Sequence, residues 1–290
     1  MPVAVAALSA TLMVRRIFGD QPMFLTYEHI TLTAPDGLTI AALTNGAAMD
    51  PLFGETAARF NPQKFGWIGS MGKLQNICVT WQGSPITRIE QAKMREVAVS
   101  ASGATGNSAI IPKIVNEFLG TKFKVIGGYT EGSGVTLALE RGEVDGVCGL
   151  SYSTLRTMRP DWFRDKKLNV ILQIGLHKLP ALPSVPSAID LVTDPDSKKV
   201  LELILIRQEM GRPFATPPNV PADRLAVLRK AFDDTLKDPA FLEAAKREGL
   251  DIDPVSGEKL QQIVQDILAS PQSVKDRLAK LIEVPGAVAR

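Results

Sequence analysis

The sequence predicts an α/β fold in which a mainly parallel sheet is flanked by helices. The middle of the chain alternates short apolar runs with helical patterns, which we read as strands at 96–101, 122–128 and 144–150 and helices at 108–119 and 131–141. Parallel neighbours need a long, right-handed crossover, and each of these helices supplies one. A chain of 290 residues is also long enough for two ordinary domains. We therefore expect two lobes.

Turn residues and periodicity place the remaining elements. Before the βαβαβ unit we expect strands at 38–43, 65–69 and 76–81 and a helix at 84–95; after it, a strand at 168–174. The segment Leu179–Pro186 holds three prolines, and because proline cannot donate to a sheet ladder it is expected to be a connector over the surface or between lobes. The last third is expected to form helices at 197–206, 222–236, 239–248, 256–268 and 271–282, with one strand at 212–215. The apolar face of the helix at 222–236 is expected in the core: Leu225, Leu228, Ala231, Phe232 and Leu236.

Composition narrows the classes of partner. Apolar residues make up 45% of the chain and charged residues 22%, which is the balance of a globular protein with a real core. The formal charge of +2 is too small to hold nucleic acid or an anionic membrane electrostatically. No apolar run reaches the length of a membrane span. The partner is therefore expected to be a small molecule.

The two cysteines, Cys78 and Cys148, are too few for a metal cluster, and each lies in an apolar run typical of a strand. We expect both to be buried, inert thiols, because a free cysteine behaves as a small hydrophobe.

The loop from Ser100 to Ser108 is the main candidate binding site. It follows an expected strand and opens a helix, where backbone N–H groups and the positive end of the helix dipole attract an anion without a charged side chain. Glycines within it allow the backbone to approach a ligand closely. We expect a carboxylate to bind here through Ser102, Gly103, Ala104, Thr105, Gly106, Asn107 and Ser108. The alternative is that Asn107 or Ser108 only caps its own helix.

Two later strands end in similar loops, and the carboxyl ends of parallel strands meet at one edge of a sheet. The expected ligand residues of these loops are Tyr129, Thr130, Gly132, Ser151 and Tyr152, and Asn45 is added from the turn after the first strand. An alternative is a satisfied helix cap, with Thr130 at the N-cap and Glu131 beside the dipole.

Catalysis finds little support in the sequence. The histidines are His29 and His177, and no H-E-x-x-H, G-x-S-x-G, C-x-x-C, Walker or G-x-G-x-x-G pattern occurs. We expect no catalytic residue, no metal site and no cofactor. A competing hypothesis is an enzyme of similar architecture that acts on a small acid, with Glu131 or Tyr129 as its first titratable candidates.

Several segments in a fixed order resemble one known family, the extracytoplasmic solute receptors of tripartite tricarboxylate transporters, also called the Bug family. The resemblance spans about Ala34 to Glu283. It is carried by these segments: Ala34–Ile40, Asn45–Gly46, Phe65–Gly69, Ser100–Ser108, Leu139–Gly146, Leu182–Pro186 and Gly211–Pro218.

The resemblance implies a type II periplasmic binding protein fold, with two α/β lobes and the ligand in the cleft between them. Crossovers would fall near Gln82–Pro85 and Leu176–Pro183, so that residues 1–83 and 177–290 form lobe 1 and residues 84–176 form lobe 2. It also implies a periplasmic monomer that binds a di- or tricarboxylate and delivers it to membrane permease subunits, without nucleic acid or membrane insertion.

The start of the chain departs from the family. Met1–Thr33 shows no counterpart of the family's first strand and its Pro/Gly-rich binding loop. A secretory signal has its positive charges before its apolar segment, whereas here Arg15 and Arg16 come after the apolar segment. We expect the signal peptide to be missing and the start to be atypical, which leaves a truncated, non-binding relic of the receptor as an alternative. A transcription regulator's effector domain is a third hypothesis, but no helix-turn-helix pattern occurs at the start.

Overall fold

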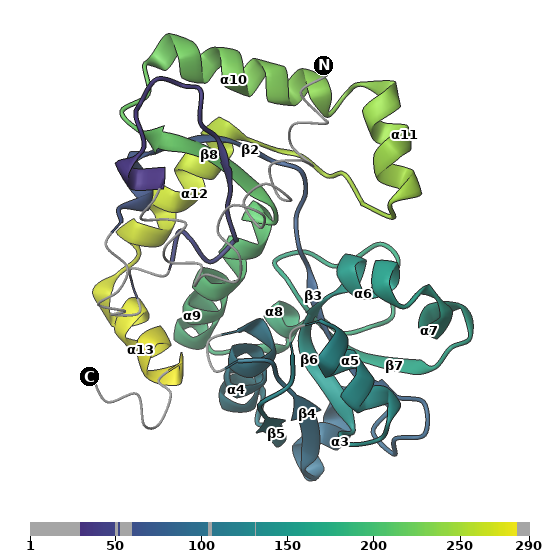
Figure 1. Cartoon of the computed structure of the whole chain (residues 1–290). Helices are drawn as coiled ribbons and strands as arrows, with labels where there is room; N and C mark the ends of the chain where they lie inside the picture. The colour runs from purple at the N-terminus through teal and green to yellow at the C-terminus, as the bar shows by residue number, and fades with distance from the viewer. Residues whose placement is uncertain (1–29, 50–51, 53–59, 104–105, 131, 283–290) are drawn as a thin grey trace. The chain divides into compact units, whose positions relative to one another are not determined.

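A computed structural model describes residues 30–49, 52, 60–103, 106–130 and 132–282 of the chain. The chain divides into two compact units, each with its own sheet and helices (Figure 1). Unit 1 comprises Met1–Leu74 and Ile206–Ser270, and unit 2 comprises Gln75–Leu205 and Pro271–Arg290. Both units are therefore built from discontinuous stretches of sequence.

Unit 2 contains a five-stranded sheet in the order β5-β4-β6-β3-β7. Its strands are β3 (Asn76–Trp81), β4 (Val97–Ser100), β5 (Phe123–Ile126), β6 (Gly146–Ser151) and β7 (Leu168–Ile174). β4 pairs in parallel with β5 and β6, whereas β3 pairs antiparallel with both β6 and β7. Four strands thus run in one direction and β3 runs against them. The predicted parallel βαβαβ arrangement is confirmed for β4, β5 and β6.

Helices cover both faces of this sheet. The helices of unit 2 are α3 (Ile89–Met94), α4 (Asn107–Leu119), α5 (Ser133–Glu140), α6 (Tyr152–Met158), α7 (Pro160–Arg164), α8 (Ala188–Leu191), α9 (Pro195–Ile206) and α13 (Gln272–Ile282). α5, α6 and α7 cover one face, where Val135, Leu139, Leu155 and Trp162 form one apolar core with Val147 of β6. α4 lies on the opposite face of β6.

The C-terminal helix α13 packs against α4 of unit 2. The guanidinium of Arg277 donates to the hydroxyl of Ser197 at 2.9 Å and lies 5.2 Å from the ring centre of Phe118. A residue near the end of the chain thereby helps to fix α4.

Unit 1 contains a four-stranded sheet whose neighbouring strands are all antiparallel, in the order β1-β8-β2-β9. Its strands are β1 (Ala41–Ala42), β2 (Phe65–Ser70), β8 (Pro213–Pro218) and β9 (Val255–Ser256). Its helices are η2 (Pro62–Lys64), η3 (Arg207–Met210), α10 (Ala222–Thr235), α11 (Pro239–Arg247) and α12 (Gly257–Ala269). The expectation of mainly parallel sheets does not hold for this unit, because each pair of neighbouring strands is antiparallel.

α10 and α12 pack against β2. The apolar face predicted for α10 does pack inward, since the rings of Phe232 and Phe214 of β8 lie 5.4 Å apart. This face is only half-buried, however: within α10 no residue is fully buried, and Leu236 just after it is 5% exposed.

The division between the units differs from the boundaries expected at 83/84 and 176/177. β3 belongs to unit 2 because it pairs along its whole length with β6 and β7. The proline-rich segment also stays with unit 2, because the side-chain amide of Gln173 donates to the carbonyls of Leu182 and Val185, both at 2.8 Å, and accepts from the N–H of Leu179. The chain passes between the two compact units at Leu74/Gln75, Leu205/Ile206 and Ser270/Pro271, rather than at the two expected crossovers.

Cys78 and Cys148 are buried as predicted, but the prediction that they are free thiols is wrong. They are direct partners on the neighbouring strands β3 and β6, and they form a disulfide. The antiparallel register of β3 against β6 brings the two cysteines together. Sequence periodicity did not reveal this register, because the two residues are separated by 70 positions.

Among the described residues, no helix combines the length and the apolar character that crossing a bilayer requires. Met1 to residue 29 lie outside the described residues, so the expectations about the start of the chain remain predictions.

Candidate functional site at the carboxyl edge of the unit 2 sheet

The candidate site begins where β4 ends and α4 starts. The N-cap of α4 is Gly106, which has an extended conformation and no side chain with which to cap the helix. The first helical hydrogen bonds run from the amides of Ala109 and Ile110 to the Gly106 carbonyl, both at 3.0 Å. α4 therefore presents its first-turn amides and the positive end of its dipole to the preceding loop, which is the arrangement that attracts an anion.

The serines of this loop fold it back onto the helix. The amide of Ser102 donates to the Ser108 hydroxyl at 3.3 Å, and the two hydroxyl oxygens lie 3.5 Å apart. Ser108 thus serves its own loop rather than acting as the N-cap of α4, and the predicted alternative that it only caps the helix is wrong. Ala104 and Thr105 lie outside the described residues.

The second predicted loop adjoins the first through the main chain. The amide of Ala101 donates to the Ile126 carbonyl at 2.8 Å, and the amide of Tyr129 donates to the Ala101 carbonyl at 3.3 Å. The parallel pairing of β4 with β5, which ends at Ser100 opposite Ile126, brings both loops to the same edge of the sheet. The sequence argument for convergence of these two loops is confirmed within unit 2.

The second loop also ends in a helix start without a side-chain cap. Gly132, not Thr130, is the N-cap of α5, and no side chain accepts from the first turn. The Thr130 carbonyl instead accepts from the amide of Val135 at 3.2 Å, and Thr130 is exposed. The expectation of Thr130 as the N-cap is therefore wrong, and Glu131 lies outside the described residues.

The hydroxyl of Tyr129 interacts with Glu143. The pKa of Tyr129 is raised, first by burial and then by the nearby Glu143 carboxylate, to which the hydroxyl is hydrogen-bonded. Glu143 precedes β6, at the amino end of that strand, whereas the loops lie at the carboxyl end. The main chain of Tyr129 belongs to the candidate site, but its hydroxyl has another partner.

The third loop follows β6, and its side chains have structural roles. The Ser151 hydroxyl caps α6 by accepting from the amide of Thr154 at 3.4 Å. The ring of Tyr152 packs edge-on against Phe163 at 5.4 Å and lies under the guanidinium of Arg156. Ser151 and Tyr152 were predicted to contact a ligand. Both lie at the expected edge of the sheet, and both make contacts within the protein there.

Asn45 lies in unit 1, in the turn after β1, and its side-chain nitrogen is buried without a hydrogen-bond acceptor in the described structure. The other predicted ligand residues that the structure describes lie in unit 2. Among the described residues no group of three histidine, cysteine or acidic side chains has the arrangement of a metal site.

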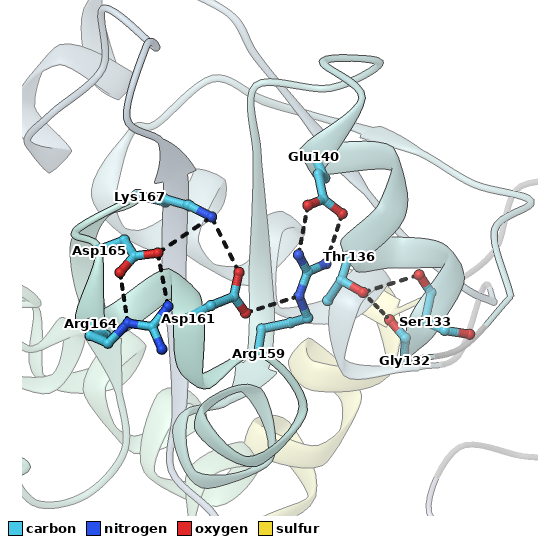
Figure 2. A network of polar contacts seen from close by, with 9 residues as sticks. All are labelled: Gly132, Ser133, Thr136, Glu140, Arg159, Asp161, Arg164, Asp165 and Lys167. Carbon is cyan, nitrogen blue, oxygen red and sulfur yellow. Dashed lines mark hydrogen bonds and ion pairs between the residues drawn. The ribbon is translucent and has the colours of Figure 1, made fainter.

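A network that sequence reasoning missed holds α5 from its far end (Figure 2). The guanidinium of Arg159 binds both oxygens of Glu140, the last residue of α5, at 2.8 and 2.6 Å. Asp161 links Arg159 to Lys167, at 3.5 and 3.3 Å, and the Arg159 guanidinium also stacks on buried Trp162, 4.1 Å from the ring centre. The guanidinium lowers the pKa of the Glu140 carboxyl. No sequence spacing signals this pairing, because Glu140 and Arg159 are 19 residues apart and Arg159 lies in the turn between α6 and α7 rather than on a helix shared with Glu140.

Two uncapped helix starts at one sheet edge can hold an anion mainly through backbone groups. The segment 100–108 contains no charged residue, and the segment 127–132 contains only Glu131. Such backbone donors can hold a small anion, a carboxylate among them, without a partner cation.

No family model and no curated protein matches this sequence. The fold, in contrast, is that of periplasmic solute-binding proteins. In particular, the chain has the fold of the TctC and Bug proteins, as the sequence resemblance predicted. It matches a TctC solute-binding protein from Polaromonas with a TM-score of 0.66 at 15% identity, over 89% of this chain and 82% of that one.

Two further structures give the same fold. The match to the periplasmic binding protein BugD has a TM-score of 0.64 at 19% identity, over 89% of this chain and 83% of that one. The match to MatC from Rhodopseudomonas palustris, solved with bound malate, has a TM-score of 0.60 at 17% identity, over 90% and 84% of the two chains. The TctC and BugD structures are both named as binding proteins.

Proposed function

We propose that this chain is a periplasmic solute receptor that binds a small organic carboxylate and delivers it to the membrane permease of a tripartite tricarboxylate transporter. The observation that carries the proposal is the pair of helix starts, at Gly106 and Gly132, that have no side-chain cap and follow neighbouring parallel strands. Both helices direct their positive ends toward the edge at which ligands bind in open α/β sheets.

Two further observations support the proposal. Structures with this fold include MatC with bound malate and a second R. palustris protein with bound adipate. The Cys78–Cys148 disulfide fits an extracytoplasmic location, because disulfides persist in oxidising compartments such as the periplasm. We expect the receptor to act as a monomer.

The enzyme hypothesis gains nothing from the site. Its described candidate, Tyr129, has its hydroxyl bound to Glu143, which leaves no titratable side chain placed at the edge by the described residues of the two loops. A binding role needs no such group.

The test is a calorimetric and thermal-shift screen of the purified chain against malate, adipate and a tricarboxylate. A ligand that binds only the folded state stabilises it by about 2.7 kcal/mol at a concentration of one hundred times its Kd, so a true ligand raises the Tm by several degrees. The matched control is dimethyl adipate, which has the same carbon chain without the charges. Equal shifts with adipate and its ester, or no shift with any acid, would contradict the proposal.

A further inference from the structure

Strand β6 contains an extra residue, Gly149, at the point where it passes the candidate site. On the neighbouring strand β3, Cys78 lies opposite Cys148 and the adjacent residue Ile77 lies opposite Leu150. Gly149 between them therefore has no partner and forms a β-bulge. Its φ of +97° is a conformation that glycine adopts without strain and that residues with a Cβ rarely adopt.

The bulge is also the place where α4 touches the sheet. A Cβ placed on Gly149 would lie 2.4 Å from the carbonyl oxygen of Asn107, the first residue of α4, and 3.2 Å from the Cβ of Ile111. Real Cβ atoms do not approach a backbone oxygen that closely. The first turn of α4 therefore rests directly on the backbone of β6, and only glycine allows this contact.

The bulge further changes which side chains face α4. Val147 and Leu150 both pack into the apolar core beneath α5, α6 and α7, although a regular strand would turn residues three apart to opposite faces. After the bulge, Ser151 pairs with buried Asn76. Without the extra residue, Ser151 would point into the apolar core and Leu150 toward α4.

From this geometry we infer that Gly149 is a positioning residue for the carboxylate site. It sets how deeply the start of α4 lies on β6, and so where the first-turn amides stand at the sheet edge. The inference rests on the proposed function, because it concerns the same site. The effect on a ligand is indirect, through the position of α4.

The test compares Gly149→Ala with Gly142→Ala. Gly142 also has a positive φ, of +71°, but a Cβ there meets nothing within 4 Å, so this control introduces a side chain at a positive φ without the collision. We expect Gly149→Ala to weaken carboxylate binding by about tenfold or more, equivalent to about 1.4 kcal/mol, and to shift the amide resonances of residues 102–108 before ligand is added. Gly142→Ala should bind as the wild type does.

A second pair of variants decides the matter if Gly149→Ala fails to fold. Ile111 and Ile114 are both buried on α4, and only Ile111 is a close neighbour of Gly149. Ile111→Ala removes the branches on the Cβ that lies nearest Gly149 and should therefore weaken binding by about threefold, whereas Ile114→Ala should lower the Tm to a similar degree with unchanged affinity.

The outcomes separate the inference from the proposed function. A folded Gly149→Ala protein with wild-type affinity overturns the inference, as do equal affinities of the two isoleucine variants. A wild-type chain that binds no carboxylate removes the proposed function and the inference with it.

Discussion

Arg159 shows how a single side chain fixes a helix that leads from the candidate site. It binds Glu140 through two hydrogen bonds, contacts Asp161, and stacks on Trp162, so its guanidinium is held from three directions. Its bidentate geometry is the stronger kind of ion pair, although Glu140 is 38% exposed and solvent screens part of the attraction. The pair ties the end of α5 to the turn between α6 and α7.

The lowered pKa of Glu140 makes the stability of the fold dependent on pH. Because the pKa of this carboxyl in the folded protein lies below its ordinary value of 4.5, the pair stabilises the fold above that value and is lost as the pH falls through the folded pKa. We expect Glu140→Gln to lower the urea midpoint at neutral pH and the difference from wild type to vanish in more acidic solution. A pH-independent difference would contradict this, and the exposed Glu202→Gln variant serves as the control.

Gly211 is a second residue on which local structure depends, in unit 1. It follows η3 with a φ of +34°, and a Cβ there would lie 1.8 Å from the carbonyl oxygen of Gly72. Nearby, the buried Ser70 hydroxyl joins the same two segments, donating to the Met210 carbonyl at 2.7 Å and accepting from the Arg212 amide at 3.0 Å.

We expect Gly211→Ala to destabilise the protein by about 3 kcal/mol or more, because backbone strain and a steric collision add. Urea unfolding measures the loss. Gly83→Ala, where a Cβ meets nothing within 4 Å, is the control and should change stability little. Similar midpoints for the two variants would show that the segments around Gly72 and Gly211 are not held as described.

At the scale of elements, the disulfide joins β3 to β6 in the centre of the unit 2 sheet. It closes a span of 70 residues, and the chain-entropy model assigns such a loop about 4 kcal/mol of stabilisation. We expect urea unfolding under reducing conditions to show a loss of that size, and the Cys78→Ala, Cys148→Ala double variant to show no response to reductant. Two reactive thiols in the unreduced, denatured protein would contradict the disulfide.

Local sequence signals predicted where helices and strands lie in the chain better than they predicted which elements pair with one another. β3 and β7 begin and end where the sequence placed them. In contrast, the helix expected at 84–95 begins only at Ile89. The side chain of Gln91 accepts hydrogen bonds from the amides of Thr87 and Arg88 and so caps the helix at this point. The strand expected at 38–43 is reduced to Ala41–Ala42. These differences arise from contacts that periodicity does not describe.

At the scale of the whole chain, the fold class and the convergence of two loops followed from the sequence, whereas long-range pairing did not. The assignment of β3 to unit 2, the disulfide and the Arg159–Glu140 pair all depend on residues far apart in sequence. The interaction of the Tyr129 hydroxyl with Glu143 likewise joins residues of two different turns. For the site, the sequence therefore indicated the loops and their backbone donors correctly, but not which side chains were already engaged.

The central claim is that backbone amides at the starts of α4 and α5 bind a carboxylate. The most direct measurement is a titration of the ¹⁵N-labelled chain with the acid that gives the largest thermal shift, followed by amide resonances. The account predicts saturable shifts that are largest at Ser102, Gly103, Gly106, Ser108 and Gly132. Saturable binding that leaves these amides unmoved, with the largest shifts elsewhere in the chain, would contradict it.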